Sequence, residues 1–293
     1  MFASKAVRFA LALGLFSGPT TAFSQTDPDD AANRVEARLD RRHERDPGDF
    51  RMLETAAEKP WLLSIGSPFR YASNPANAET GSTGAAYFDP SITLGRSWDL
   101  GGAKLSFETG ADAQTFTSHS ENDLSTLYGN LRVTFGAGSA IKPYVDYTVL
   151  ALYDGQFESH AVTLHQFTAG AKAQLPVGKA DTLVVDASVM RREASVATVE
   201  QVRLGLAFKV KHVFDPASRL VLSARGRYAD YTGGSASTRT DKNLLLGAVI
   251  EHDLSDKASI DFGTTFERNW SNRTGKSYSA WEIGPSVTFT ASF

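Results

Sequence analysis

Apolar and polar side chains alternate along most of this chain, from Trp61 to Phe293. In the clearest run, every even position from 202 to 210 is Val, Leu or Phe, and the odd positions from 203 to 211 include three cations. The same pattern recurs at 127–135 and 183–189. A period of two sustained over this length is typical of β-strands and not of helices. The pattern therefore predicts an all-β protein.

Turn signals between the alternating runs divide this region into about twelve strands. The predicted strands are 61–72, 86–100, 103–117, 124–135, 141–153, 161–175, 182–193, 201–214, 219–231, 243–254, 259–270 and 280–293. Most are much longer than the five or six residues of an average globular strand. They are instead long enough to supply the roughly 9 to 11 residues that a tilted strand needs to cross a membrane.

Short turns alternate with longer polar loops, of which 232–242 and 271–279 are the clearest. Aromatic residues gather at both ends of the predicted strands, as they do at the two interfaces of a membrane. One group comprises Trp61, Trp98, Phe135, Phe214 and Phe293, and the other comprises Tyr71, Tyr153, Tyr228, Trp270 and Trp281. We therefore predict a transmembrane, up-and-down antiparallel β-barrel of about twelve strands, with both of its ends on the periplasmic side.

The first 60 residues do not follow this pattern. Residues 1–24 read as a cleaved signal peptide, with Lys5 and Arg8 before the apolar run 9–16 and small residues near Ser24. Residues 25–59 are crowded with charge, and we expect a periplasmic leader that is partly helical or disordered. The barrel is predicted to occupy residues 60–293.

Charge and composition narrow the classes of function. The chain has 30 Lys and Arg against 33 Asp and Glu, and removing the signal peptide leaves 28 basic residues. This mild acidity argues against a nucleic-acid binder. The chain has no cysteine, and no metal-ligand spacing or phosphate-binding loop is found. We expect no cofactor, no bound metal and no enzyme activity.

The last seven residues end on an aromatic residue with apolar residues at alternate positions before it. This segment resembles the C-terminal signature strand of bacterial outer-membrane barrels, which the barrel-insertion machinery reads; the resemblance implies an insertion signal at Val287, Phe289 and Phe293. The stretch 266–272 followed by Tyr278 also resembles the penultimate hairpin of barrels associated with polysaccharide export or surface-lipoprotein assembly. No residue role is carried over from this second resemblance.

The inferred register turns many charged residues toward the barrel lumen. These are Glu108, Asp112, Arg132, Asp146, Lys172, Asp186, Arg192, Arg203, Lys209, Lys211, Arg225, Arg227, Glu251, Asp261, Glu267 and Glu282. Five cations lie on two adjacent strands and form a predicted basic stripe, with Arg132 as a further basic lumen residue. Such a stripe opposite an acidic wall favours anions along one side. Alternatively, the charges pair across strands and fill the lumen.

Two cations, Arg191 and Arg268, fall on the predicted lipid face near the outer rim. The free-energy cost of a cation on the lipid face is lowest near the membrane interface. We therefore expect both residues to contact lipopolysaccharide phosphates.

The function expected from these features is an outer-membrane pore or export conduit for an anionic oligosaccharide or polysaccharide. One alternative is a plugged structural or assembly barrel that binds partners through its loops or leader. A second is an outer-membrane hydrolase. His119 is the candidate base for that activity, but adjacent residues such as Ser120 do not form a catalytic triad with it. The expected partners are outer-membrane lipid, lipopolysaccharide, the insertion machinery and an anionic saccharide.

Overall fold

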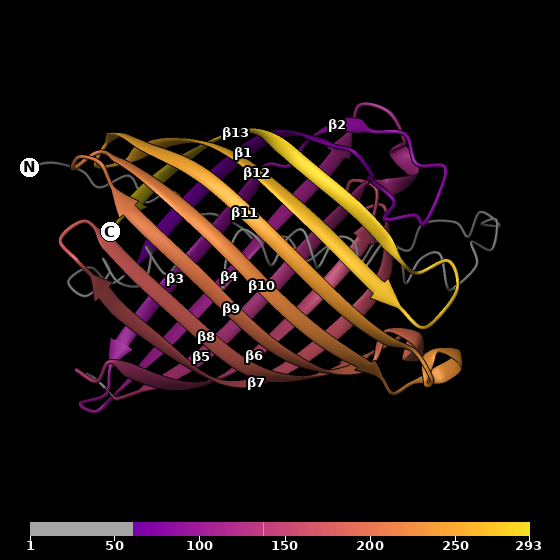
Figure 1. Cartoon of the computed structure of the whole chain (residues 1–293), viewed down its shortest axis with the longest axis horizontal. Helices are drawn as coiled ribbons and strands as arrows, with labels where there is room; N and C mark the ends of the chain where they lie inside the picture. Colours follow the sequence, from indigo (N-terminus) through magenta and orange to yellow (C-terminus); the bar gives the residue numbers. More distant parts are fainter. Residues whose placement is uncertain (1–60, 137) are drawn as a thin grey trace, which may run out of the picture.

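The computed structural model describes residues 61–136 and 138–293, which wrap into a single closed sheet (Figure 1). The strands are β1 (Leu62–Ala72), β2 (Ala85–Phe88), β3 (Ser91–Asp99), β4 (Ala103–Phe116), β5 (Leu124–Phe135), β6 (Ile141–Asp154), β7 (Ser159–Val177), β8 (Asp181–Ala194), β9 (Gln201–Val213), β10 (Ser218–Tyr231), β11 (Thr240–Ser255), β12 (Ala258–Ser271) and β13 (Tyr278–Ser292). The predictions for residues 1–24 and 25–59 lie outside the described residues.

Every strand pairs antiparallel with its neighbours, and β13 pairs with β1 to close the barrel. The closure includes a reciprocal pair of backbone hydrogen bonds. The Trp61 N–H donates to the Phe293 oxygen at 3.0 Å, and the Phe293 N–H donates to the Trp61 oxygen at 3.1 Å. Both β2 and β3 pair with β1 and β4, so the two segments share one position in the wall. The barrel therefore has twelve positions, as predicted.

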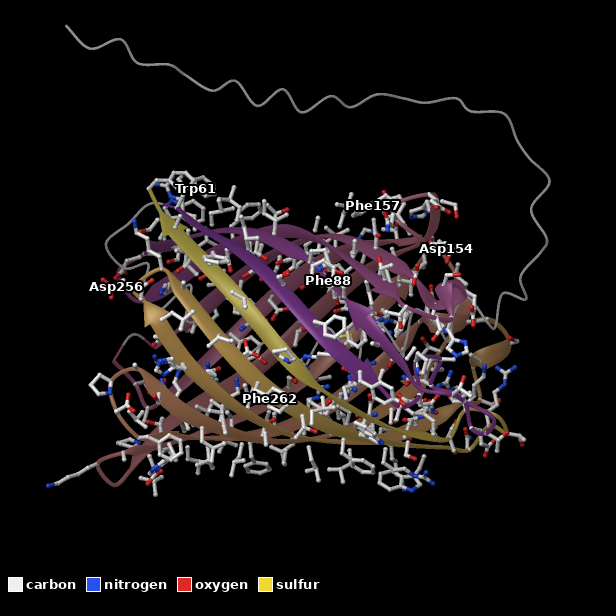
Figure 2. All side chains as sticks on the ribbon, turned by 90° about the horizontal axis from the view of Figure 1, so that it is seen from above. Trp61, Phe88, Asp154, Phe157, Asp256 and Phe262 are labelled. Carbon is white, nitrogen blue, oxygen red and sulfur yellow. The ribbon has the colours of Figure 1, made fainter. Side chains whose placement is uncertain are left out.

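The barrel has a turn end and a loop end. The turn end carries the short connections after β3, β5, β7, β9 and β11, together with Trp61 and Phe293. The loop end carries the longer connections, including residues 73–84 and 232–239; Trp61 and Asp154 mark the two ends in Figure 2. In one turn, the Asp215 carboxylate accepts the N–H groups of Ala217 (2.8 Å) and Ser218 (2.9 Å), and these bonds lower its pKa.

The outer surface is apolar because alternate side chains of every strand point outward. On β9, Leu204, Leu206 and Phe208 are all exposed, whereas Arg203 on the opposite face is buried. Phe262 stands on the same outer surface in Figure 2. An apolar surface that surrounds the whole wall is far larger than a water-soluble monomer tolerates. It is the surface that a bilayer requires.

No helix in the described part of the chain is long and apolar enough to cross a membrane.

The inner face is not polar throughout. At the loop end, Leu150 and Leu152 of β6 and Val162 and Leu164 of β7 point inward and form a buried cluster with Val199. Val199 belongs to the short 3₁₀ helix η2 (Ala197–Val199), which thus covers part of the lumen wall. Simple alternation does not predict this cluster. The β6 segment is apolar on both faces, and the β7 segment has its apolar residues on the inner face, with Thr163 and His165 on the outer one.

Candidate solute pathway

The predicted basic stripe is continuous along the inner wall. In the register between β9 and β10, Arg203 lies opposite Ala229, Arg227 opposite Gly205 and Arg225 opposite Ala207. Lys209 then lies opposite Ser223 and Lys211 opposite Val221. Five successive inward levels therefore hold one cation each, and every cation faces a small or apolar residue. Arg219 adds a sixth cation one level nearer the turn end.

Two arginines of the inner wall, Arg219 and Arg227, are held by partners on other strands. Arg219 is bound by two carboxylates: its Nε donates to Glu251 at 2.5 Å, and its Nη1 donates to Asp253 at 2.6 Å. Arg227 donates to the Asn243 side-chain oxygen at 2.9 Å, and its Nη2 lies 3.8 Å from Glu267. These bonds fix the guanidinium groups and reduce the net charge they present to a solute.

Lys209 and Lys211 differ from the arginines. Neither ammonium group makes a hydrogen bond or an ion pair within residues 61–136 and 138–293. Their opposite partners on β8, Val184 and Thr182, carry no charge. The part of the stripe near the turn end therefore keeps two positive charges that the wall does not neutralise.

Arg132 lies apart from the stripe, on β5. It is buried, donates to Asp146 at 2.7 Å and stacks on the ring of Tyr144. The Tyr144 hydroxyl crosses above Gly170 and donates to Asp186 on β8 at 2.9 Å. A side chain at position 170 would collide with this ring, since an added Cβ would lie 2.6 Å from it. Arg132 thus belongs to a fixed polar layer of the wall.

The acidic wall is also built from satisfied side chains. Glu282 on β13 accepts the Tyr87 hydroxyl at 2.7 Å. Glu267 on β12 accepts the Tyr278 hydroxyl at 2.9 Å and the Asn243 amide at 2.5 Å. The predicted inward positions thus have two roles: most are cross-linked into the wall, and two lysines are not.

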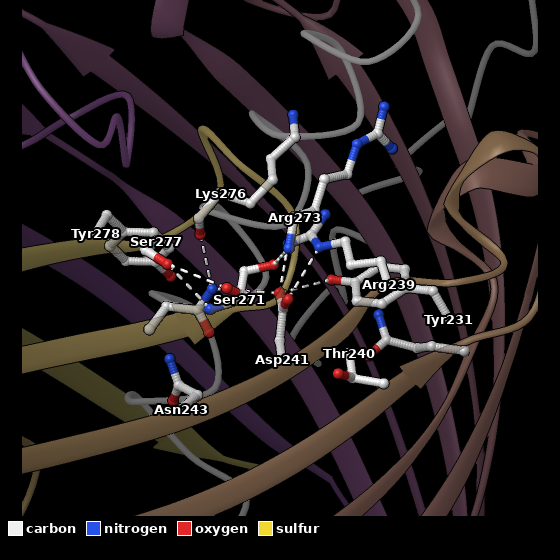
Figure 3. A network of polar contacts seen from close by, with 12 residues as sticks. Tyr231, Arg239, Thr240, Asp241, Asn243, Ser271, Arg273, Lys276, Ser277 and Tyr278 are labelled. Atoms are coloured by element: carbon white, nitrogen blue, oxygen red, sulfur yellow. Dashed lines mark hydrogen bonds and ion pairs between the residues drawn. The ribbon is translucent and has the colours of Figure 1, made fainter.

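A buried network of polar side chains links the loop ends of β10, β11 and β12 (Figure 3). The Asp241 carboxylate accepts the hydroxyl of Tyr231 at 3.4 Å and the amide of Asn269 at 3.2 Å, and it forms an ion pair with Arg239. Asn269 also donates to the Lys276 carbonyl at 2.9 Å. The network ties three strand ends and two loops together, and so gives this side of the mouth a fixed shape.

Both predicted rim cations lie on the outer face near the loop end. Arg191 on β8 donates to the Thr232 hydroxyl at 3.1 Å, and Arg268 on β12 lies 5.8 Å from the centre of the Trp270 ring. The sequence prediction missed Lys242, an exposed outward residue of β11 directly opposite Trp270. The alternation predicts a strand only from residue 243, whereas β11 begins three residues earlier, at Thr240.

A further outward cation, also missed, lies at the turn end. Arg96 on β3 lies between two tryptophans, 5.4 Å from the Trp61 ring centre and 5.0 Å from that of Trp98. Cation–π contact of this kind lets a cation remain near an apolar interface.

The predicted insertion signal lies on the outer face of β13. Val287, Phe289 and Phe293 occupy alternate outward positions, and Phe289 and Phe293 are exposed. Their positions fit the pattern of the signature strand.

His119 lies in the loop after β4 and contacts two side chains. Its Nε2 is 2.6 Å from the Thr83 hydroxyl, and its Nδ1 is 3.1 Å from Glu121. The hydroxyl partner is Thr83 of the β1–β2 loop, not the adjacent Ser120. Among the described residues, no group of three or more His, Cys, Asp or Glu residues is placed to hold a metal ion.

No protein-family model matches this chain, and no curated protein matches it in sequence. Solved structures do share its fold. An outer membrane channel from Pseudomonas putida F1 aligns with a TM-score of 0.58 and 10% identity, over 84% of this chain and 99% of the channel. The translocator domain of the autotransporter NalP from Neisseria meningitidis aligns with a TM-score of 0.52 and 13% identity, over 89% of this chain and 98% of that domain.

The closed antiparallel wall, its apolar outer surface and this shared fold agree. The chain is a β-barrel protein of the bacterial outer membrane.

Proposed function

We propose that this barrel is a non-enzymatic outer-membrane conduit that favours anionic solutes along its basic stripe. The observation that carries the proposal is the succession of cations at consecutive levels of β9 and β10. Two of them, Lys209 and Lys211, have no hydrogen-bond or ion-pair partner among the described residues. A one-sided charge in a lumen with low-dielectric walls raises the local concentration of counter-ions and orients them.

An anionic oligosaccharide or polysaccharide fits the geometry of the stripe. Successive inward levels are two strand residues apart, or about 6.6 Å along a strand. With the usual strand tilt of about 35–45°, this becomes about 5 Å along the barrel axis. That spacing is comparable with the length of one sugar ring, so a chain with one acidic group per sugar meets a cation at each level. A flexible small anion gains no such periodic match.

The plugged-barrel alternative has its own support in the many cross-linked charges. Arg132 and Arg219 are bound to carboxylates of the adjacent strand, and Arg227 lies 3.8 Å from the Glu267 carboxylate, two strands away. If every charged side chain of the lumen is paired within the wall, no charge remains to attract a solute. The two hypotheses differ in the role of Lys209 and Lys211. In a conduit their charges attract anionic solutes, whereas in a plugged barrel each lysine would need an acidic partner.

Single-channel conductance of the refolded full chain in planar bilayers tests the proposal. We expect discrete current steps that favour anions, because the stripe attracts them. Replacing both lysines, as Lys209→Gln with Lys211→Gln, removes two charges from the lumen and is expected to lower the anion-to-cation permeability ratio several-fold.

The matched control is Lys242→Gln with Arg268→Gln, which removes the same charge from the outer face and is expected to leave the ratio unchanged. A correctly folded barrel that passes no current would refute the conduit, and unchanged selectivity in the lysine variant would refute the role of the stripe.

The hydrolase alternative depends on the contacts of His119 with Thr83 and Glu121. A hydroxyl, an imidazole and a carboxylate in sequence are the elements of a nucleophilic site. The alternative requires lipid ester hydrolysis by the full chain that His119→Ala abolishes.

A further inference from the structure

The barrel wall is interrupted at one level where three prolines lie on adjacent strands. Pro68 belongs to β1, Pro90 separates β2 from β3, and Pro285 lies halfway along β13. The pairing of β13 with β1 omits Phe69 and Arg70, although the register is the same on both sides of the gap. The interruption is therefore a local loss of pairing without a shift of the strands.

Each proline removes one hydrogen-bond donor from a different ladder. Just after β1, the Ser73 N–H donates to the Trp281 oxygen, and the Trp281 N–H donates to the Ser73 hydroxyl. The odd-numbered backbone groups of β13 therefore face β1. Pro285 thus lacks the N–H that would face the Phe69 carbonyl. In the next ladder, the Asp89 N–H donates to the Pro68 oxygen at 3.1 Å, but Pro68 has no N–H to return.

The third ladder shows the same defect. The Ala113 N–H donates to the Pro90 oxygen at 3.1 Å, and Pro90 has no N–H to return the bond. In the other described ladders, the register shifts only near strand ends, at Leu152/Tyr153 and Asp253/Ser255. Backbone groups at membrane depth are normally all paired, because lipid supplies no partner. Three adjacent missing bonds at mid-depth make this the weakest part of the wall.

An unpartnered arginine lies directly behind the interruption. Arg70 occupies an inward position of β1 and makes no hydrogen bond or ion pair within residues 61–136 and 138–293. Its Nε is buried and unsatisfied. The guanidinium Nη2 lies beside Gly263, and the Cα and Cγ of Arg70 lie beside Gly284. These two glycines face each other on β12 and β13 and present no side chain. A guanidinium in this position is a binding group for an oxyanion.

The lipid side of the same level is apolar. Phe69, Phe88 and Phe262 are 52%, 42% and 53% exposed there, and Figure 2 shows Phe88 and Phe262 on either side of β1 and β13. The wall thus has a cation on its inner side, hydrocarbon-compatible rings on its outer side, and a weakened ladder between them.

We propose that this level is a lateral portal between the lumen and the membrane, for an amphiphile with an oxyanion head and a hydrocarbon chain. The head binds Arg70, and the chain extends between β1 and β13 into the bilayer. This route is separate from the solute conduit proposed above and does not depend on the basic stripe.

A disulfide lock tests the portal. The chain has no cysteine, so Tyr71→Cys with Ile283→Cys creates a single disulfide. It joins directly opposed residues of β1 and β13, next to the unpaired positions on their loop-end side. The probe is 11-(dansylamino)undecanoate, a carboxylate amphiphile, added to the full chain in phosphatidylcholine vesicles. We expect the oxidised lock to slow saturable probe binding roughly tenfold and reduction to restore it. The matched control is Tyr228→Cys with Lys242→Cys, an opposed pair at the loop end of β10 and β11, which should have no effect.

Arg70→Gln tests the head group. Loss of one charge-assisted contact is expected to weaken probe affinity roughly tenfold. Because β1 is not adjacent to β9 or β10, we expect anion selectivity of the conductance to fall less than in the double lysine variant. The Lys209→Gln with Lys211→Gln variant should show the reverse, which separates failure of the portal from failure of the conduit. Heat-modifiable migration verifies folding of each variant. The proposal is overturned if the unlocked barrel shows no saturable probe binding, or if the oxidised lock leaves the binding rate unchanged.

Discussion

At the scale of single residues, the direction of each side chain was predictable but its partners were not. Strand alternation alone places Arg203, Lys209 and Lys211 on the inner face, as found. The partners depend on which strands are neighbours and on their register, and a single sequence does not specify register to the residue. This is why the sequence does not distinguish the bonded Arg227 from the lysines, which have no hydrogen-bond or ion-pair partner among the described residues. Arg70 and Arg219 also occupy inward positions of predicted strands but are absent from the predicted lumen residues.

The outward cations at the loop end lead to a prediction about lipopolysaccharide. Arg191, Lys242 and Arg268 all lie near the interface, where cations are tolerated and phosphate groups are abundant. We expect Arg191→Ala with Arg268→Ala to reduce co-purified lipopolysaccharide and to lower the melting temperature only when lipopolysaccharide is present. Thermal melting with and without added lipopolysaccharide checks this. Equal melting curves for the variant and the parent in both conditions would contradict it, and Lys257→Ala at the turn end is the control.

At the scale of elements, the predicted strands agree with the observed ones to within a few residues. Long turns of polar residues and glycine mark their ends clearly, and the alternation marks their interiors. The exception is the predicted strand 86–100, which is divided into β2 and β3 at Asp89 and Pro90. Alternation continues across this break, so only the missing N–H of Pro90 reveals it, and its effect depends on neighbouring strands.

The interrupted ladder predicts the effect of restoring a donor. Pro285→Val supplies an N–H opposite the Phe69 carbonyl and a side chain favoured in strands. We expect a gain of about 1 kcal/mol in the free energy of unfolding, together with slower binding of the amphiphilic probe. Urea unfolding in vesicles measures the first effect. Pro143→Val, at the turn end of β6, is a control that should not slow binding. A variant that is less stable than the parent would show that the missing bond is not what weakens the wall.

At the scale of the whole molecule, fold and membrane location followed from the sequence, because strand length, alternation and aromatic belts are properties of the entire chain. The interior apolar cluster around Leu152 did not. The β6 segment is apolar on both faces, so its sequence does not indicate which face is covered, and on β7 the apolar residues face inward. The function of the lumen depends on the few side chains that the wall leaves unbonded. These are identified only after all the strands have been placed.

The C-terminal strand carries a prediction for assembly in cells. Phe293 is both the last residue of the proposed insertion signal and a partner of Trp61. We expect deletion of Phe293 to reduce the amount of protein in the outer membrane several-fold, with much less effect on refolding into detergent. Phe293→Tyr should restore the cellular level, because it keeps an aromatic end. Fractionation and heat-modifiable migration measure both, and equal loss in cells and in detergent would assign Phe293 a purely structural role.

The reciprocal bonds between Trp61 and Phe293 also affect the order of folding. These two residues flank the first and last strands of the barrel, so the wall is not complete until β13 pairs with β1. Until then the growing sheet has two open edges, and open edges pair readily with other chains. Closing a loop that contains the entire barrel is also slow. A partly exported chain is therefore vulnerable to aggregation for the whole duration of its export. It avoids aggregation only if its open edges are kept from pairing with other chains until the last strand is present.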